Sequence, residues 1–356
     1  MDEPSAEELA ALDRPRSEWA TVGGLLLRRP IGIPAGPLLN SKFTDAAFRW
    51  GYDLCHYKTV RSRFWPSHPA PNVLRVDAPE PIPAGEIGRT TLVARRFDND
   101  EVVNLATLSI TNSFGMPTQQ PHVWQADMEL AVRGAGPGQA LVASITGTQD
   151  PGGNEAGYVA DHARTAAMCV ETGAHAIEVN LSCPNLGGHG LMCHDPQAAG
   201  QVCKAVRQAI GSLPLFAKLG NYPPDEAGEA TLRSVVQATA PYVQGYGAVN
   251  AVPVPVVAPD GEPALPGKGR SLAGVCGAAL KATGLDVVRR LATIRAAGGY
   301  DYAIIGVGGL ASPADFMAYM EAEADAVQGA TGPMWNYRLA VEIALAFKPA
   351  IIGSAR

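Results

Sequence analysis

The fold of this chain is decided by the segment Ala176-Ile177-Glu178-Val179-Asn180-Leu181-Ser182-Cys183-Pro184-Asn185. Its apolar start is typical of a buried strand, and Pro184 prevents the chain from continuing as an ordinary helix. The Cys183 thiol therefore stands where a strand enters a loop, which in α/β barrels is where catalytic groups collect. A thiol has an ordinary pKa of about 8.5, so suitable surroundings allow it to act as a base. The alternative is a cysteine that only packs.

Seven further apolar runs resemble this strand, and helical patterns separate the later ones. The eight expected strands span residues 31–34, 54–60, 141–145, 176–181, 215–219, 248–252, 303–307 and 324–328. Helical patterns cover 158–172, 196–210, 225–240, 284–297 and 313–322. Strands that alternate with helices form parallel sheets, and eight such units predict an α/β fold of the (β/α)8 TIM barrel type.

The region from 66 to 121 interrupts this alternation between the second and third expected strands. It is rich in proline and contains β-prone pieces at 72–76 and 90–97. We expect a small antiparallel insertion over the mouth of the barrel, where inserted loops commonly build an active site. No flexible linker follows residue 140, so residues 1–356 are predicted to form one domain with an N-terminal extension over 1–25. The alternative is a second independent domain.

Composition and charge argue against several classes of protein. A formal net charge of −6 argues against a broad surface for nucleic acid or for an anionic membrane, while 47% hydrophobic residues permit a substantial core. The acidic N-terminus lacks a secretory signal, and no long apolar run follows, so a cytoplasmic location is expected. The six cysteines have no paired spacing, which predicts free thiols and no metal site.

Polar residues follow several of the expected strands. Lys58 and Lys218 end the second and fifth strands in equivalent positions around the ring, and Asn250 ends the sixth. Either lysine alone is compatible with an ammonium that extends to solvent. Two of them at strand ends favour an anion or an electron-rich ring at the mouth of the barrel, because a buried ammonium needs such a partner.

Glycine-containing loops supply further candidate binding elements. The turn Asn112-Ser113-Phe114-Gly115-Met116-Pro117 allows backbone N–H groups to face a carboxylate, although an ordinary Asn-Ser turn has the same pattern. Glycine-rich segments occupy 267–277, 306–309 and 329–332. The last two follow the seventh and eighth strands, where barrels commonly bind phosphate.

Taken together, these motifs resemble the dihydroorotate dehydrogenases, specifically the soluble class 1 group with a cysteine base. The resemblance runs from about residue 31 to residue 334 and includes Lys58, the 112–117 turn, the hexapeptide 180–185, Lys218 and Asn250. It implies an FMN-containing barrel that oxidises (S)-dihydroorotate to orotate in de novo pyrimidine biosynthesis. Cys183 would take the proton from carbon 5, and FMN would take the hydride from carbon 6.

The resemblance also implies roles for the matching positions. The expected catalytic residues are Cys183 and Lys58. The expected substrate contacts are Lys58, Asn112, Phe114, Gly115, Met116, Asn180, Asn185 and Asn250. The expected FMN contacts are Ala35, Gly36, Lys58, Thr59, Asn180, Lys218, Val249, Gly274, Gly308, Gly309, Ala330 and Thr331. The stretch 184–195 would close over the site as a lid.

Departures from the family pattern leave other functions open. Ala251 stands where the family has a serine, Pro253 and Pro255 follow it, and Cys276 stands in place of a glycine. One alternative is a reductase of uracil or thymine similar to dihydropyrimidine dehydrogenase, whose lid resembles 187–193. Others are an FMN oxidoreductase specialised for another cyclic amide and, from another class, a flavin-binding protein without turnover. Lys58 and the 112–117 turn favour dihydroorotate, because uracil and thymine have no carboxylate.

The sequence does not identify the oxidant of reduced FMN. Fumarate would suit a homodimer, which the resemblance favours. NAD would require a partner subunit with its own flavin and iron–sulfur cluster, because this chain has no cysteine cluster for one. The first 30 residues lack the amphipathic apolar face of the membrane-associated class that uses quinone.

Overall fold

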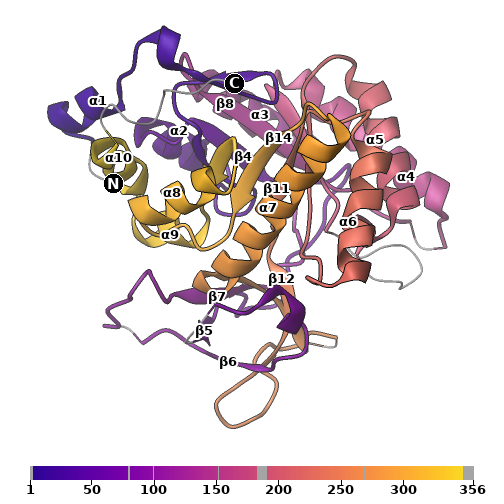
Figure 1. The fold of residues 1–356 in the computed structure, drawn as a ribbon. Coiled ribbons are helices and arrows are strands. Elements are labelled where there is room, and N and C mark those ends of the chain that lie inside the picture. The colour runs from indigo at the N-terminus through magenta and orange to yellow at the C-terminus, as the bar shows by residue number, and fades with distance from the viewer. Residues whose placement is uncertain are drawn as a thin grey trace.

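Eight parallel strands form the centre of the molecule and close into a barrel (Figure 1). The computed structural model describes residues 3–78, 81–98, 100–150, 152–182, 191–267 and 269–347. The strands pair in the order β10, β11, β14, β15, β3, β4, β8 and β9. Their bounds are β3 (Ile31–Ile33), β4 (Leu54–Val60), β8 (Ala140–Ile145), β9 (Ala176–Asn180), β10 (Leu215–Lys218), β11 (Gly245–Ala248), β14 (Ala303–Val307) and β15 (Ala326–Gln328). The predicted (β/α)8 barrel is confirmed.

Helices cover the outside of the barrel (Figure 1). They are α1 (Ala6–Leu12), α2 (Ser41–Arg49), α3 (Pro121–Gly134), α4 (Glu155–Glu171), α5 (Pro196–Ile210), α6 (Glu226–Thr239), α7 (Lys281–Gly298), α8 (Pro313–Glu321), α9 (Thr331–Trp335) and α10 (Leu339–Ala346). In α5, Val202, Val206 and Ile210 bury one face at helical spacing, and the Asp195 side chain caps the first turn. The five expected helices are present, each within three residues of its predicted ends.

The position predicted for the sixth strand was wrong. It was expected at 248–252, whereas β11 is Gly245–Ala248. Glycine has a low strand propensity, so the sequence Gly245-Tyr246-Gly247 did not indicate a strand. The structure shows why glycine occurs there: a Cβ atom at residue 245 would lie 2.8 Å from the Ala303 carbonyl oxygen. The two strands approach each other so closely at this position that there is no room for a side chain.

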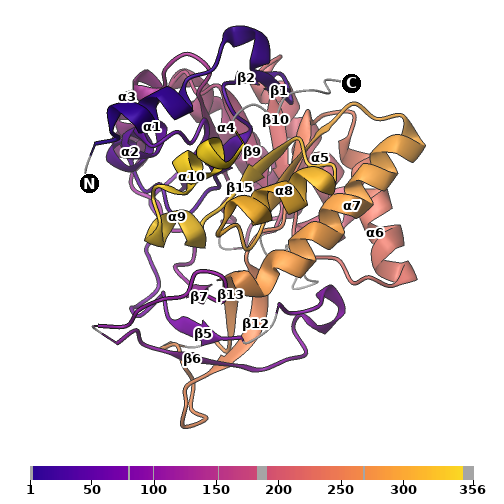
Figure 2. The ribbon, with the colours of Figure 1, turned by 60° about the vertical axis from the view of Figure 1, so that its left-hand side comes forward.

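The N-terminal region packs on the barrel and fills one of its ends. The hairpin of β1 (Ala20–Val22) and β2 (Leu25–Leu27) lies at the end opposite the small sheet described below (Figure 2). Val22, Leu25 and Leu27 form one apolar cluster with inward-facing residues of the barrel, among them Leu54 and Phe216. Helix α1 lies against α10, where Arg338 pairs with Glu8. The apolar hairpin therefore closes this end of the barrel.

A second, smaller sheet lies beyond the carboxyl ends of the barrel strands (Figure 2). It contains β5 (Arg75–Asp77), β6 (Leu92–Arg95), β7 (Ser109–Asn112), β12 (Val252–Val257) and β13 (Leu272–Gly277), closed in the order β12, β13, β7, β5, β6. The expected insertion over 66–121 supplies only three of these strands, and the β6–β12 pair is parallel. Pro253 and Pro255, noted above as a departure from the family pattern, alternate in β12 with buried valines. Proline is tolerated where its missing N–H is not needed by the ladder.

No helix in the described parts of the chain combines the length and the apolar character needed to cross a membrane.

We predict that the hairpin contributes directly to barrel stability. Leu27 is fully buried in the interior cluster, whereas its neighbour Leu26 is 41% exposed. Leu27→Ala should lower the free energy of unfolding by about 2–4 kcal/mol, since it leaves a cavity in a packed core. Leu26→Ala should change it by less than about 0.5 kcal/mol. Urea unfolding of both variants measures the difference, and equal stability of the two would contradict the closing role of the hairpin.

Candidate functional site

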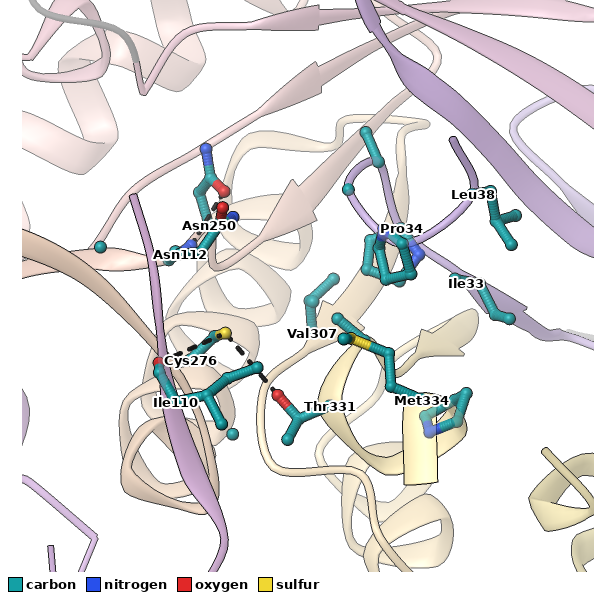
Figure 3. Close-up of a pocket in the computed structure, with 18 of the residues that line it drawn as sticks. Ile33, Pro34, Leu38, Ile110, Asn112, Asn250, Cys276, Val307, Thr331 and Met334 are labelled. Carbon is teal, nitrogen blue, oxygen red and sulfur yellow. Dashed lines mark hydrogen bonds between the residues drawn. The ribbon is translucent and has the colours of Figure 1, made fainter. Parts of the chain in front are cut away.

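A cavity of about 840 Å³ lies between the carboxyl ends of the barrel strands and the small sheet. This volume is within the range of cavities that bind cofactors and small substrates. In Figure 3, Asn112 and Asn250 lie together on one side of the cavity, and Pro34 lies across from them. Thr331 and Met334 border another part. The cavity is thus built from both the barrel and the insertion.

Every expected site residue that the structure describes lines this one cavity. These residues are Ala35, Gly36, Lys58, Thr59, Asn112, Phe114, Gly115, Met116, Asn180, Lys218, Val249, Asn250, Gly274, Gly308, Gly309, Ala330 and Thr331. Cys183 and Asn185 lie outside the described residues, and so does the expected lid up to residue 190. The roles expected for all these residues remain predictions. The residues that the structure describes line the same cavity.

Backbone conformation after β14 makes room at one edge of the cavity. Gly308 and Gly309 have φ angles of 134° and 64°, in the region that favours glycine. A Cβ atom at residue 308 would lie 2.9 Å from the Leu280 carbonyl oxygen, and the Gly308 carbonyl itself accepts a hydrogen bond from the Tyr319 hydroxyl at 2.7 Å. Ala330 and Thr331, which follow β15, line the cavity beside these two glycines. Exposed backbone at the ends of these two strands is suited to bind a phosphorylated ligand.

Two amide side chains, one at the end of β9 and one just after β11, are joined in the cavity wall. Asn250 Nδ2 donates to Asn180 Oδ1 at 3.2 Å, and the same oxygen accepts from the Ser182 N–H at 3.0 Å. Asn180 Nδ2 lies 3.4 Å from the sulfur of Met116, which belongs to the 112–117 turn. Asparagine amides supply both donors and acceptors, so this group can match the edge of a cyclic amide.

A buried charged cluster lies beside the cavity, and its Lys218 lines the cavity floor. Lys218 Nζ donates to Glu178 Oε2 at 3.4 Å, and His56 Nδ1 lies 3.2 Å from Glu178 Oε1. These side chains are at most 5% exposed. Burial alone would raise the pKa of Glu178, but attraction by His56 and Lys218 outweighs burial and lowers it to about 2. Glu178 is therefore a carboxylate at neutral pH and holds the Lys218 ammonium beside the cavity.

The 112–117 turn is held by residues that the sequence did not single out. The His68 N–H donates to the Phe114 carbonyl oxygen at 3.0 Å, and His68 Nδ1 lies 3.0 Å from the Ser113 carbonyl oxygen. Arg61 Nε donates to the Met116 carbonyl oxygen at 3.2 Å. His68 and Ser182 also line the cavity. The position of Ser182 within the hexapeptide was a usable signal, whereas His68 lies in an irregular stretch that offered none.

Cys276 is another cavity residue outside the expected set. Thr331 Oγ1 donates to its sulfur at 3.6 Å. Burial raises the pKa of the Cys276 thiol to about 11, so it is protonated at neutral pH. Cys276 forms no disulfide bond with another described cysteine. Cys276 therefore offers the cavity a neutral thiol rather than a base.

Comparison with known proteins gives consistent matches. A family model described as dihydroorotate dehydrogenase matches residues 81–345. A dihydroorotate dehydrogenase of Dictyostelium discoideum is 32% identical over 332 residues, which cover 92% of this chain and 87% of that protein. The catalytic subunit of dihydroorotate dehydrogenase B (NAD(+)) from Methanocaldococcus jannaschii is 37% identical over 157 residues, or 44% of this chain and 47% of the relative. The dihydroorotate dehydrogenase (quinone) of Prochlorococcus marinus is 27% identical over 324 residues, 88% of this chain and 71% of the relative.

We predict that Glu178→Gln destabilises the protein in a manner that depends on pH. At pH 7 it should lower the free energy of unfolding by about 3 kcal/mol, because it leaves the buried Lys218 ammonium without its carboxylate and the buried His56 ring without its acceptor. The pKa of Glu178 lies below its ordinary value of 4.5, so the stabilisation is complete above pH 4.5 and is lost as the pH falls through about 2. Denaturant unfolding between pH 7 and pH 3 measures this dependence.

Glu129→Gln, at a half-exposed ion pair with Arg133, is the control and should change stability by less than about 1 kcal/mol. A Glu178→Gln variant as stable as the parent at pH 7 would refute the role of the cluster.

Proposed function

Because the chain belongs to the dihydroorotate dehydrogenase family, we propose that it oxidises (S)-dihydroorotate to orotate with bound FMN, as a step of de novo pyrimidine biosynthesis. The proposal depends most on one observation: the described residues expected to contact substrate and flavin line a single cavity. The chain is an oxidoreductase by family, and the substrate, the cofactor and the residue roles are what we propose.

FMN fits the chemistry of this cavity. The backbone at Gly308 and Gly309, where a side chain would meet Leu280 or Lys281, leaves space and amide groups for a phosphate. Lys218, fixed by Glu178, offers a positive charge at the floor. We assign the flavin contacts to Ala35, Gly36, Lys58, Thr59, Asn180, Lys218, Val249, Gly274, Gly308, Gly309, Ala330 and Thr331. When bound, FMN supplies an acceptor for the hydride that leaves carbon 6 of the substrate.

The residues of the chain orient the substrate and remove its proton. Asn112, Asn180, Asn185 and Asn250 hold the amide edges of the dihydropyrimidine ring. The Lys58 ammonium and the backbone amides around Gly115, between Phe114 and Met116, bind the carboxylate. Cys183, as its thiolate, takes the proton from carbon 5, so that the carbon 5–carbon 6 double bond forms as the hydride leaves. Closure of 184–195 excludes water from the site.

One feature of the cavity favours a second candidate substrate. Ala251 lines the cavity and offers a methyl group where the family motif has a hydroxyl. A site with one fewer polar group suits another cyclic amide, or a neutral dihydropyrimidine such as that formed by a uracil or thymine reductase. Lys58 and the 112–117 turn argue for dihydroorotate, because they offer a cation and N–H donors that a neutral ring does not use.

We propose fumarate as the acceptor and a homodimer as the assembly. The relatives differ here, since their names specify NAD(+) in one case and quinone in another. Among the described residues, no group of three or more His, Cys, Asp or Glu side chains could hold a metal ion.

The substrate proposal predicts orotate as the product. The purified yellow protein, supplied with L-dihydroorotate and a redox dye, should form orotate in equal amount to the dye reduced. Replacement of the dye by fumarate, NAD or a soluble quinone then identifies the acceptor. Oxidation of dihydrouracil but not of dihydroorotate would contradict the proposal and favour the neutral substrate.

The assignment of the base predicts the behaviour of two substitutions. Cys183→Ala should retain FMN but lose flavin reduction by dihydroorotate by about 100-fold or more at neutral pH, as expected for a missing general base. Cys183→Ser should be slow near neutral pH and recover as the pH rises, because a hydroxyl is a poorer base. Cys169→Ala, at a buried cysteine of α4 that does not line the cavity, is the matched control. Unchanged reduction in Cys183→Ala would remove Cys183 from the mechanism.

A further inference from the structure

Arg270 is a buried cation that the proposed function leaves without a role. It lies near the end of the loop between β12 and β13, and it is only 7% exposed. Its guanidinium makes six hydrogen bonds, all of them to neutral acceptors. Within the described part of the chain, no carboxylate lies within ion-pair distance of it. A buried guanidinium usually pairs with an anion, so this one requires an explanation.

The contacts of Arg270 join three separate segments at the 112–117 turn. Nη1 donates to the carbonyl oxygens of Pro69 and Pro266, at 2.8 and 2.7 Å. Nη2 donates to Asn72 Oδ1 at 2.8 Å and to the Ser113 carbonyl oxygen at 3.1 Å, and Nε donates to Ser113 Oγ at 3.3 Å. One planar group thus fixes Ser113 against two loops distant in sequence.

Asn72 extends this support along the turn. Its carbonyl oxygen accepts from the Ser113 N–H at 3.1 Å, and its Nδ2 donates to the His68 carbonyl oxygen at 3.2 Å. His68 in turn donates its backbone N–H to the Phe114 carbonyl oxygen. The Ser113 N–H and the carbonyl groups of Ser113 and Phe114 are therefore engaged on the side of Arg270. The N–H groups of Phe114 and Gly115 have no hydrogen-bond partner among the described residues, and both residues line the cavity.

The positive charge of Arg270 also acts on the turn. The carbonyl dipoles around Arg270 compensate its charge only in part, and a carboxylate bound at the turn would lie on the opposite side of Ser113. We propose that Arg270 is a positioning residue that shapes and charges the 112–117 turn for a carboxylate, so that the site selects an anionic pyrimidine over a neutral one. This inference rests on the proposed function. Arg270 itself does not line the cavity and acts through Ser113.

Orotate binding tests this role directly. Isothermal titration calorimetry of orotate into the FMN-loaded protein compares the parent with Arg270→Met and Arg270→Lys. Arg270→Met should raise the orotate Kd about tenfold or more, and Arg270→Lys about threefold or more, because a lysine retains the charge but not the fork that orients Ser113. FMN content should stay unchanged, and the KM for dihydroorotate should rise with little change in kcat.

A surface arginine of the same region supplies the control. Arg63 is 41% exposed and pairs with Asp150, so Arg63→Met removes one positive charge without a contact to the turn among the described residues. It should leave orotate affinity within about twofold of the parent. If Arg270→Met does not fold or loses FMN, the orotate Kd of the Arg270→Lys protein alone tests the inference.

Parent-like orotate affinity in Arg270→Lys and in any folded Arg270→Met protein would overturn the inference. An equal loss of kcat and of FMN, with unchanged orotate affinity, would likewise reduce Arg270 to a structural residue. A parent protein that retains FMN but does not bind orotate would instead contradict the proposed function, and the inference with it.

Discussion

The buried carboxylate of Glu178 is the constraint on which the site depends. Inward positions of β9 change from apolar Ala176 to charged Glu178 within two residues, and on β4 the same step leads from Leu54 to His56. Lys218 can keep its ammonium at this depth because Glu178 supplies the opposite charge. The hairpin of β1 and β2 fills the apolar end of the barrel, and the ionisable side chains of His56, Glu178 and Lys218 lie towards the other end. The carboxylate therefore sets where the core ends and the cavity begins.

The second determinant of the site is the small sheet, because it converts an open barrel mouth into a cavity. Two segments far apart in sequence build it, and β13 pairs with β7 directly beside the 112–117 turn. The barrel contributes cations and amides, while the sheet contributes a turn of fixed shape that faces them. Arg270 lies in the loop between β12 and β13 and holds the turn through Ser113. In the function that we propose, chemistry and selectivity come from different layers of one fold.

The sequence predicts the barrel well because buried parallel strands are continuous apolar runs that local composition reveals. It fails at β11, where glycines permit close strand contact, and at β12, where prolines occupy alternate positions of a strand. Glu178 was visible within a strand, but its partners on β4 and β10 depend on barrel closure. Arg270 meets Ser113 across 157 positions of sequence. Such contacts follow from the tertiary fold and leave no local pattern, whereas motif residues such as Lys58 were predicted by resemblance.

The most direct measurement is anaerobic stopped-flow mixing of the flavin-loaded protein with L-dihydroorotate, followed at the visible absorbance of the flavin. We predict rapid bleaching whose rate saturates with substrate, because the proposed site places the flavin and the dihydropyrimidine in one cavity. Flavin that stays oxidised with dihydroorotate, yet is reduced by dithionite, would contradict the account.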